Sequence, residues 1–256
     1  MKIKTIKKMA KEKYQITFDD GEKIILQDQI ILDHNILYKK EIDDELKEVL
    51  LKENVYYEVY NKTVTYIMKR LRSEEEVRKY LIKYELKQKD IDSIVAKLKS
   101  IHLIDDLVYA KSFTSDKLNF TNDGPLKIKS ELEKNNIDSN IIEEVIESIN
   151  LDNSKDKIIR YIEKKIRLNK NKSLSMLKQK LLNDLSKMGY PKDFIYDCFN
   201  VVEFIDNDVI TKEYNKLYLK LSKKYSGNEL NYKIREKLFK KGFESSEITD
   251  VINKNS

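Results

Sequence analysis

The chain has 256 residues, a formal net charge of +6, and only five glycines and two prolines. So few turn-forming residues disfavour sheets with many tight turns and favour a mainly helical protein. No stretch approaches the roughly twenty consecutive apolar residues that span a bilayer, and the lysine-rich start lacks the apolar segment of a secretory signal, so we expect a soluble, cytoplasmic protein.

The first segment has the pattern of a β-hairpin. Tyr14, Ile16 and Phe18 alternate with polar residues, as in a half-buried strand. Asp20-Gly21 is a tight-turn pair, and residues 23–26 return as an apolar run. Two antiparallel strands are therefore expected here.

Two helical patterns follow the hairpin, at residues 29–37 and 43–52. Asp43 or Asp44 can cap the second helix, because a carboxylate there accepts from free N–H groups at the positive end of the helix dipole. We assign residues 1–54 to a small N-terminal α/β module.

From residue 77 onward, one spacing of apolar residues recurs four times, at intervals of 51, 53 and 53 residues. Two apolar residues four apart end a helix, a hydrophobic residue five later lies in the turn, and a second helix opens five beyond it with apolar steps of three, one and three. The copies are Val77-Leu81-Leu86-Ile91-Ile94-Val95-Leu98, Ile128-Leu132-Ile137-Ile142-Val145-Ile146-Ile149, Leu181-Leu185-Tyr190-Ile195-Cys198-Phe199-Val202 and Ile234-Leu238-Phe243-Ile248-Val251-Ile252. Such self-similarity is typical of tandem helical repeats.

Each repeat has room for a third helix, which would cover the apolar stripe that two short helices leave open. These first helices are predicted at residues 55–71, 106–118, 155–168 and 208–222. Four three-helix repeats then cover residues 55–104, 105–152, 153–205 and 206–256. Because no Pro-rich or Gly/Ser-rich linker separates them, the expected fold class is mainly α: tandem three-helix repeats forming an elongated, curved array after the N-terminal hairpin and helix module.

Helix-capping residues agree with these boundaries. Ser73 followed by Glu76 is a capping box, and Gly124-Pro125 is typical of a helix start. Gly189 and Gly242 suit helix C-caps, and Asp90, Asp138 and Ser246 stand shortly before the third helices.

Adjacent carboxylates such as Asp105-Asp106 suggest a metal or acid/base site, but neighbours on a helix point about 100° apart and cannot chelate as a pair. We interpret this pair as capping the first helix of the second repeat. Asp206 and Asp208 are expected to repeat the arrangement before the last repeat.

Positive charge is concentrated in the second half of the chain. Residues 1–152 carry 27 basic and 30 acidic groups, a balance of −3, whereas residues 153–256 carry 23 and 14, a balance of +9. A basic half attracts polyanions such as nucleic acid, although a lysine-rich solvated surface explains the same charge.

One helix concentrates this charge on a single face. Arg160, Lys164 and Arg167 share that face, opposite Ile158, Ile159, Ile162 and Ile166. Lys165, Lys170 and Lys172 extend the charge, Tyr161 is a candidate for partner contact, and Lys220, Lys223 and Lys224 end the first helix of the fourth repeat. A solvated face, or contacts with the helix dipole, is the plain alternative for these residues.

The sequence contains few residues of the types that catalysis and metal binding usually need. The only cysteine, Cys198, occupies a template position held elsewhere by Ile94, Val145 and Val251, so we expect a buried small hydrophobe. His34 and His102 stand in unrelated contexts. We therefore expect no cofactor, no metal site and no enzymatic activity.

Several motifs resemble those of the RecX family, and they fall in the right order on the repeats. Ile104-Asp105-Asp106-x-x-Tyr109-Ala110-x-x-Phe113, followed by Gly124 and Glu131-Leu132, is similar to the family's second-repeat signature. Arg70-Leu71-Arg72-Ser73-x-x-Glu76-Val77 resembles its first-repeat motif, and Leu185-x-x-Met188-Gly189-Tyr190 resembles its third. The resemblance covers about residues 60–256; the extra repeat, with Lys240-Lys241-Gly242-Phe243, is similar to longer RecX proteins that also carry an N-terminal extension.

The resemblance implies a regulator of the RecA recombinase. It implies a monomer that binds the RecA–DNA filament, and single- and double-stranded DNA more weakly, and that suppresses ATP hydrolysis and strand exchange in recombination and DNA repair. Arg70, Arg72 and Lys117 join the candidate contacts, although the family usually has an arginine where this chain has Lys117, and Lys-Gly where it has Asn135-Asn136. A RecA-independent DNA-binding protein and a peptide-binding helical scaffold stay open as alternatives.

Overall fold

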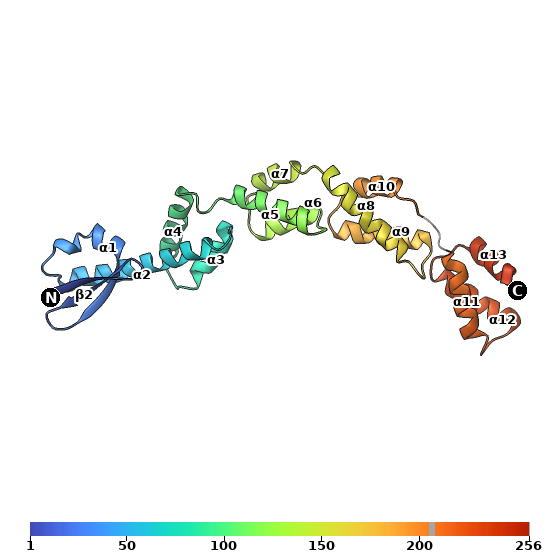
Figure 1. The fold of residues 1–256 in the computed structure, drawn as a ribbon, viewed down its shortest axis with the longest axis horizontal. Helices are drawn as coiled ribbons and strands as arrows, with labels where there is room; N and C mark the ends of the chain where they lie inside the picture. The colour runs from blue at the N-terminus through green and yellow to red at the C-terminus, as the bar shows by residue number, and fades with distance from the viewer. Residues whose placement is uncertain (205–207, 256) are drawn as a thin grey trace. The chain divides into compact units, whose positions relative to one another are not determined.

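The computed structural model describes residues 1–204 and 208–255 (Figure 1). The chain forms two compact units, the first made of residues 1–111 and 135–141, and the second of residues 112–134 and the chain from 142 onward. Across the described ranges, no helix combines the length and the apolar character needed to cross a bilayer. The elements are helices apart from one small sheet, which confirms the expected mainly α fold.

The first unit opens with a three-stranded antiparallel sheet in the order β1-β2-β3. Its strands are β1 (Ile3–Met9), β2 (Lys13–Phe18) and β3 (Lys23–Gln27). The β2–β3 hairpin is the predicted one, with Ile16 opposite Ile24. Strand β1 was not predicted, because it is mostly exposed and lacks the alternating apolar pattern of a half-buried strand.

The apolar face of the sheet is covered by helices. Phe18 and Leu26 are fully buried beside Ile30 of α1 (Asp28–Asp33) and Leu50 of α2 (Asp44–Ile67). A short 3-10 helix, η1 (Ile36–Tyr38), follows α1, so the helix predicted over residues 29–37 is in fact two short pieces.

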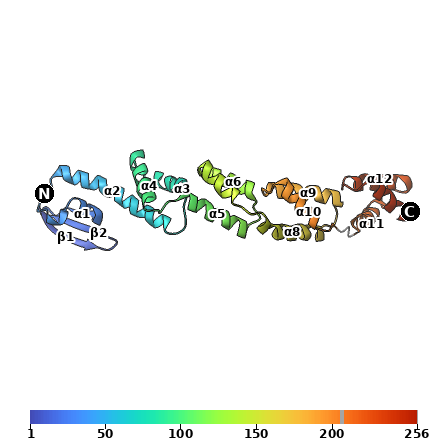
Figure 2. The same ribbon diagram turned by 90° about the horizontal axis from the view of Figure 1, so that it is seen from above.

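Helix α2 is continuous for 24 residues, from the predicted cap at Asp43, whose carboxylate accepts from the Leu46 N–H. It joins two helices that the sequence suggested were separate. Asn54 lies between them and binds the edge of β3: its Oδ1 accepts from the Gln27 N–H (2.8 Å) and its Nδ2 donates to the Ile25 carbonyl (3.1 Å). The helix thereby covers an edge that would otherwise expose unpaired backbone groups. Figure 2 shows α2 running from the sheet to α3 and α4.

The first repeat is completed by α3 (Glu74–Ile82) and α4 (Gln88–Ser100). The predicted capping box of Ser73 and Glu76 is present at the start of α3. The Glu74 N–H, another free donor of this helix end, is bound by the Asp106 carboxylate (2.9 Å).

The second repeat consists of α5 (Asp106–Phe120), α6 (Pro125–Lys134) and α7 (Ser139–Glu147). The Asp105 carboxylate accepts from the N–H groups of Leu107 (2.9 Å) and Val108 (3.0 Å), which confirms it as a helix cap. Pro125 is the first residue of α6, as predicted.

The third and fourth repeats lie in the second unit. They are α8 (Asp152–Arg167), α9 (Leu174–Lys187) and α10 (Lys192–Val201), then α11 (Val209–Leu221), α12 (Gly227–Phe239) and α13 (Ser245–Asn255). Each set packs around its own apolar cluster. The template residues Leu81, Leu132, Leu185 and Leu238 are all buried at the same place in their repeats, so the repeat is confirmed.

Each repeat uses a left-handed residue to end its second helix. The residue four after the template leucine has positive φ in all four copies: Glu85 (54°), Asn136 (57°), Gly189 (90°) and Gly242 (81°). Gly189 and Gly242 are thus the C-cap glycines that were predicted. Asn136 replaces the glycine that is common in the RecX motif, and asparagine is among the L residues that adopt this conformation most readily.

Gly124 and Gly189 join the second and third repeats by direct backbone contact. The Gly124 N–H donates to the Met188 carbonyl (2.6 Å), and the Leu126 N–H donates to the Gly189 carbonyl (3.0 Å). A Cβ atom on Gly124 would lie 2.7 Å from the Gly189 carbonyl carbon. We call this contact the glycine joint.

The third and fourth repeats meet in the same way. The Ser173 N–H, at the start of α9, donates to the Lys241 carbonyl (3.3 Å), and a Cβ atom on Gly242 would lie 2.9 Å from the Ser173 Oγ. In both cases the start of a second helix contacts the left-handed turn of the next repeat.

Some predicted caps were wrong in detail. Asp90 and Ser246 lie inside the first turns of α4 and α13, although Asp138 does precede α7 and accepts from the Asn140 N–H (2.8 Å). Asp208 precedes α11 in a left-handed conformation and makes no side-chain cap. Asp206 lies outside the described residues.

Candidate partner-binding surface

Helix α8 separates apolar and basic side chains onto opposite faces, as predicted. Ile158 and Ile162 are fully buried in the core of the third repeat, with Ile166 beside them. Arg160, Lys164 and Arg167 are exposed. Within residues 1–204 and 208–255, these three cations form no ion pair. Their charges therefore face solvent and are available to an external anion.

Tyr161 is anchored to its own repeat. It is half-buried against the apolar cluster of the third repeat, and the Lys165 ammonium lies 5.2 Å from its ring centroid. The ring thus packs against the core while holding a cation beside the basic face.

The loop after α8 gathers more lysines. Its shape is fixed by Asn169, whose Nδ2 donates to the Lys172 carbonyl (2.7 Å) and whose Oδ1 accepts from the Lys172 N–H (3.2 Å). A pocket of about 310 Å³ opens beside it and contains four lysines, Lys165, Lys170, Lys172 and Lys180, against one carboxylate, Asp184. A neighbouring pocket of about 580 Å³ is lined by Arg167 and Lys170 together with Lys212 of α11. We call Arg160, Lys164, Lys165, Arg167, Lys170, Lys172 and Lys180 the α8 basic surface.

The second group of predicted cations ends α11. Lys220 lies in the last turn of the helix, Lys223 and Lys224 follow it, and all three are exposed. Cations there are favoured by the negative end of the helix dipole, which is a sufficient reason for their placement.

Arg70 and Arg72 are engaged inside the first repeat. Both guanidinium groups reach Glu76, the capping-box glutamate, and Arg72 also stacks on Tyr66, 4.0 Å from the ring centroid. Burial of Glu76 opposes its ionisation, but hydrogen bonds from Arg70 and the Ser73 N–H outweigh burial, so the pKa of Glu76 is lowered. The two arginines thus stabilise a helix end.

Lys117 is similarly engaged, by Glu131 and by Asp123 (3.5 Å). The hydrogen bond with Glu131 raises the pKa of the Lys117 ammonium. Lys127 is also paired with Asp123. The charge of Lys117 is therefore balanced by carboxylates of its own repeat.

Cys198 is buried in the core of the third repeat, as predicted from its template position. Burial raises the pKa of its thiol, which disfavours the thiolate that nucleophilic chemistry needs.

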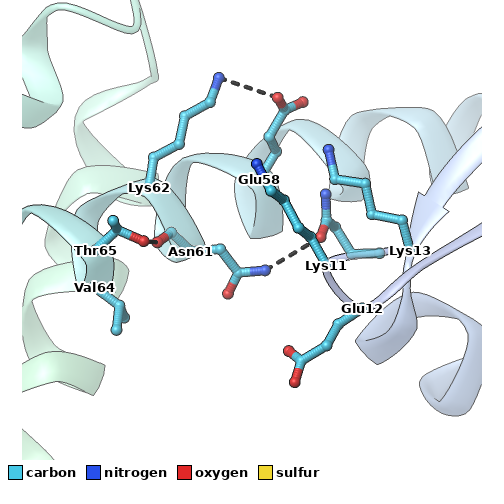
Figure 3. A pocket seen from close by; sticks show the side chains of 9 residues that line it. Lys11, Glu12, Lys13, Glu58, Asn61, Lys62, Val64 and Thr65 are labelled. Atoms are coloured by element: carbon cyan, nitrogen blue, oxygen red, sulfur yellow. Dashed lines mark hydrogen bonds and ion pairs between the residues drawn. The ribbon is translucent and has the colours of Figure 1, made fainter. Parts of the chain in front are cut away.

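A pocket in the first unit could not be predicted from the sequence, because three separate segments build it. The pocket has a volume of about 570 Å³ (Figure 3). It is lined by Lys11, Glu12 and Lys13 of the β1–β2 turn, by Gln27 at the end of β3, and by Glu58, Asn61, Lys62, Val64 and Thr65 of α2. We call it the turn pocket.

Comparison with known proteins shows which family shares this architecture. Residues 105–146, which include α5 and α6 and most of α7, match the family model described as "RecX, second three-helix domain". A protein of Streptococcus agalactiae named "Regulatory protein RecX" is 33% identical over 260 residues, which cover 98% of each chain. The chain belongs to the RecX family. Because the match spans nearly the whole chain, RecX similarity includes the N-terminal module as well as residues 60–256.

Solved RecX structures agree with the fold. One, titled "Crystal structure of regulatory protein RecX", aligns with a TM-score of 0.69 at 20% identity and covers 78% of this chain and 98% of its own. The RecX structure from Lactobacillus salivarius aligns with a TM-score of 0.56 at 26% identity and covers 60% of this chain and 99% of its own. The RecX relatives carry the name of regulatory proteins, which agrees with a regulatory role.

Proposed function

We propose that this RecX protein is a non-enzymatic regulator that binds the RecA–DNA filament and limits RecA ATP hydrolysis, filament assembly and strand exchange. The observation that carries the proposal is the α8 basic surface, where Arg160, Lys164 and Arg167 stand exposed and form no ion pair within the described residues. Its contrast with Arg70, Arg72 and Lys117, which have internal partners, directs the choice of contact residues.

The charge distribution supports a polyanionic partner. Residues 153–256 carry 23 basic against 14 acidic groups, and the cations of α8 are attached to a helix that the core holds in place. Cations that neutralise DNA phosphates release condensed counterions, which favours binding and makes it depend on salt. The DNA within a RecA–DNA filament offers phosphates at regular spacing.

The repeat architecture supports a polymeric partner. Each repeat provides one small surface, and neighbouring repeats in the second unit are joined through backbone contacts at Gly189 and Gly242. Several weak contacts on one chain reinforce one another when their spacing matches that of the partner, because every contact after the first is intramolecular. We propose that successive repeats contact successive parts of the filament.

The test compares two triple variants in a RecA ATPase assay on single-stranded DNA. Arg160→Glu/Lys164→Glu/Arg167→Glu removes the α8 face, and Lys4→Glu/Lys7→Glu/Lys23→Glu makes the same charge change at exposed positions of the sheet. We expect the unaltered protein and the sheet variant to suppress ATPase activity and strand exchange, and the α8 variant to need at least about tenfold more protein. An unaltered protein that leaves ATPase activity, filament length and strand exchange unchanged at saturation would contradict the proposal.

The lysine-rich pocket beside α8 favours one rival, a DNA-binding protein that acts without RecA. This rival predicts that DNA binding falls steeply with salt while RecA activity stays unaffected. The ATPase assay and a DNA-binding assay with the same variants separate the two functions.

A further inference from the structure

We propose that the turn pocket of the first unit is a second binding site, which recognises an acidic peptide segment of a partner protein. The site lies away from the α8 basic surface in sequence, and binding there is independent of contact with a RecA filament. Four features of the pocket carry it.

The pocket contains an amide donor that has no protein partner among the described residues. The Gln27 side chain lines the pocket although the residue is only 2% exposed. Its Oε1 accepts from the Asn61 Nδ2 (3.2 Å), while its Nε2 makes no hydrogen bond to any residue in 1–204 and 208–255. The Nε2 group keeps some solvent access, so an acceptor oxygen that enters the pocket can reach it.

Two cations stand at the entrance with their charge unmet. Figure 3 shows Lys11 and Lys13 of the β1–β2 turn together with Glu58 and Asn61 of α2. Lys62 is paired with Glu58 (3.0 Å), whereas Lys11 and Lys13 have no ion pair in the described part of the chain. An anionic group that enters the pocket would be attracted by both lysines and could accept from the Gln27 amide.

The turn that carries these lysines is held in a costly conformation. Lys11 and Glu12 both have positive φ, 59° and 55°, as in the hairpin turns that usually require Asn-Gly. The Asp28 N–H donates to the Glu12 carbonyl (2.9 Å), and this bond fixes the turn on α1. Backbone strain of this kind concentrates at binding sites, where it preorganises the contacting groups.

The carboxylates of the pocket select a peptide over nucleic acid. Glu12 and Glu58 line the same space, and because Glu58 is paired with Lys62, Glu12 is the carboxylate left to accept from a donor of the ligand. A nucleic-acid backbone offers acceptors for the lysines but no donor for these carboxylates, whereas a peptide offers carboxylates for Lys11 and Lys13 and N–H groups for Glu12. The mixed lining therefore fits an acidic peptide, and the volume lies in the range of ligand pockets.

The experiment uses the full-length protein and fluorescein-labelled hexaglutamate, followed by fluorescence anisotropy. Uncharged hexaglutamine and an oligothymidylate of matched length serve as comparison probes. We expect saturable binding of hexaglutamate, weakened about tenfold by Gln27→Leu and at least as much by Lys11→Glu/Lys13→Glu, because each change removes a charge-assisted contact. Lys4→Glu/Lys7→Glu on β1, the matched control outside the pocket, should leave binding within about twofold.

The proposal fails if hexaglutamate does not bind saturably, if hexaglutamine binds equally well, or if the control variant weakens binding as much as the pocket variant. It also fails if oligothymidylate binds more tightly than hexaglutamate and loses affinity in the pocket variant, since the site would then be a nucleic-acid site. Should Gln27→Leu prevent folding, as judged by circular dichroism, the exposed lysine variants still decide the outcome.

Discussion

Replacing Gly189 with alanine tests the glycine joint. Gly189 has a φ of +90°, and a Cβ atom there would lie 2.4 Å from the Lys127 backbone nitrogen and 2.7 Å from the Lys127 Cβ. Both atoms belong to the first turn of α6, so the added methyl must push α6 away from the turn that precedes α10. The hydrogen bonds from the Gly124 and Leu126 N–H groups would then lengthen or break.

The cost has two parts. A left-handed conformation costs an L residue about 1–2 kcal/mol. Loss of two backbone hydrogen bonds at about 1 kcal/mol each, with some overpacking, adds about 2–4 kcal/mol. Gly21 separates these parts because its φ is +89° and a Cβ atom there would meet nothing within 4 Å. Gly21→Ala should therefore cost only the backbone part.

Amide hydrogen exchange is the suitable assay, because repeat proteins open locally and a single melting temperature would average over repeats. We expect the Leu126 amide to exchange at least about 30-fold faster in Gly189→Ala, which corresponds to about 2 kcal/mol of local stability. Gly124→Ala, which also brings a Cβ against the Gly189 backbone, should act in the same direction. Equal local losses in Gly189→Ala and Gly21→Ala would refute the idea that the glycines are needed for close contact.

Three further predictions follow from single residues. Glu85→Gly should stabilise the first repeat by up to about 1 kcal/mol, measured by hydrogen exchange of α3, because Glu85 holds a φ of 54° that glycine adopts without strain. Burial raises the pKa of Tyr190 to about 12, so the neutral phenol is favoured in the folded state. The stability that this preference contributes is present below pH 10 and is lost as pH rises towards 12. Tyr190→Phe should remove that alkaline loss of up to about 3 kcal/mol, seen in urea unfolding across this range; an unchanged pH profile would contradict it. The lowered pKa of Glu76 acts in the opposite direction, because the folded state favours the ionised carboxylate. The stability that Glu76 contributes is present above its unfolded-state pKa and is lost as pH falls through its folded-state pKa. Glu76→Gln should therefore flatten the acid loss of α3 protection below about pH 4.5, and an unchanged loss would count against the Arg70 pairing.

Much of the fold could be predicted because each repeat has the same spacing of apolar residues. The four template leucines are buried alike, and the caps at Ser73, Asp105 and Gly189 follow from local chemistry that needs no tertiary partner. The continuous α2 could not be predicted from local pattern, because Asn54 is held in the helix by hydrogen bonds to a strand 27 residues away.

The functional surface was predicted only in part. The α8 face follows from steps of three and four within one helix, and the structure places those cations in solvent. Arg72 had a visible signal for its internal role, since Glu76 follows four residues later, which is the spacing of a helical ion pair. The turn pocket gives no such signal in the sequence, because the Gln27 amide is positioned by Asn61, which is distant in sequence.

Hydrogen exchange of the whole protein, with and without RecA filaments on single-stranded DNA, tests the central claim most directly. We expect new protection over residues 160–172, in α8 and the loop that follows it. Protection confined to residues 1–54, with α8 exchanging as in the free protein, would contradict the claim that this basic surface contacts the filament.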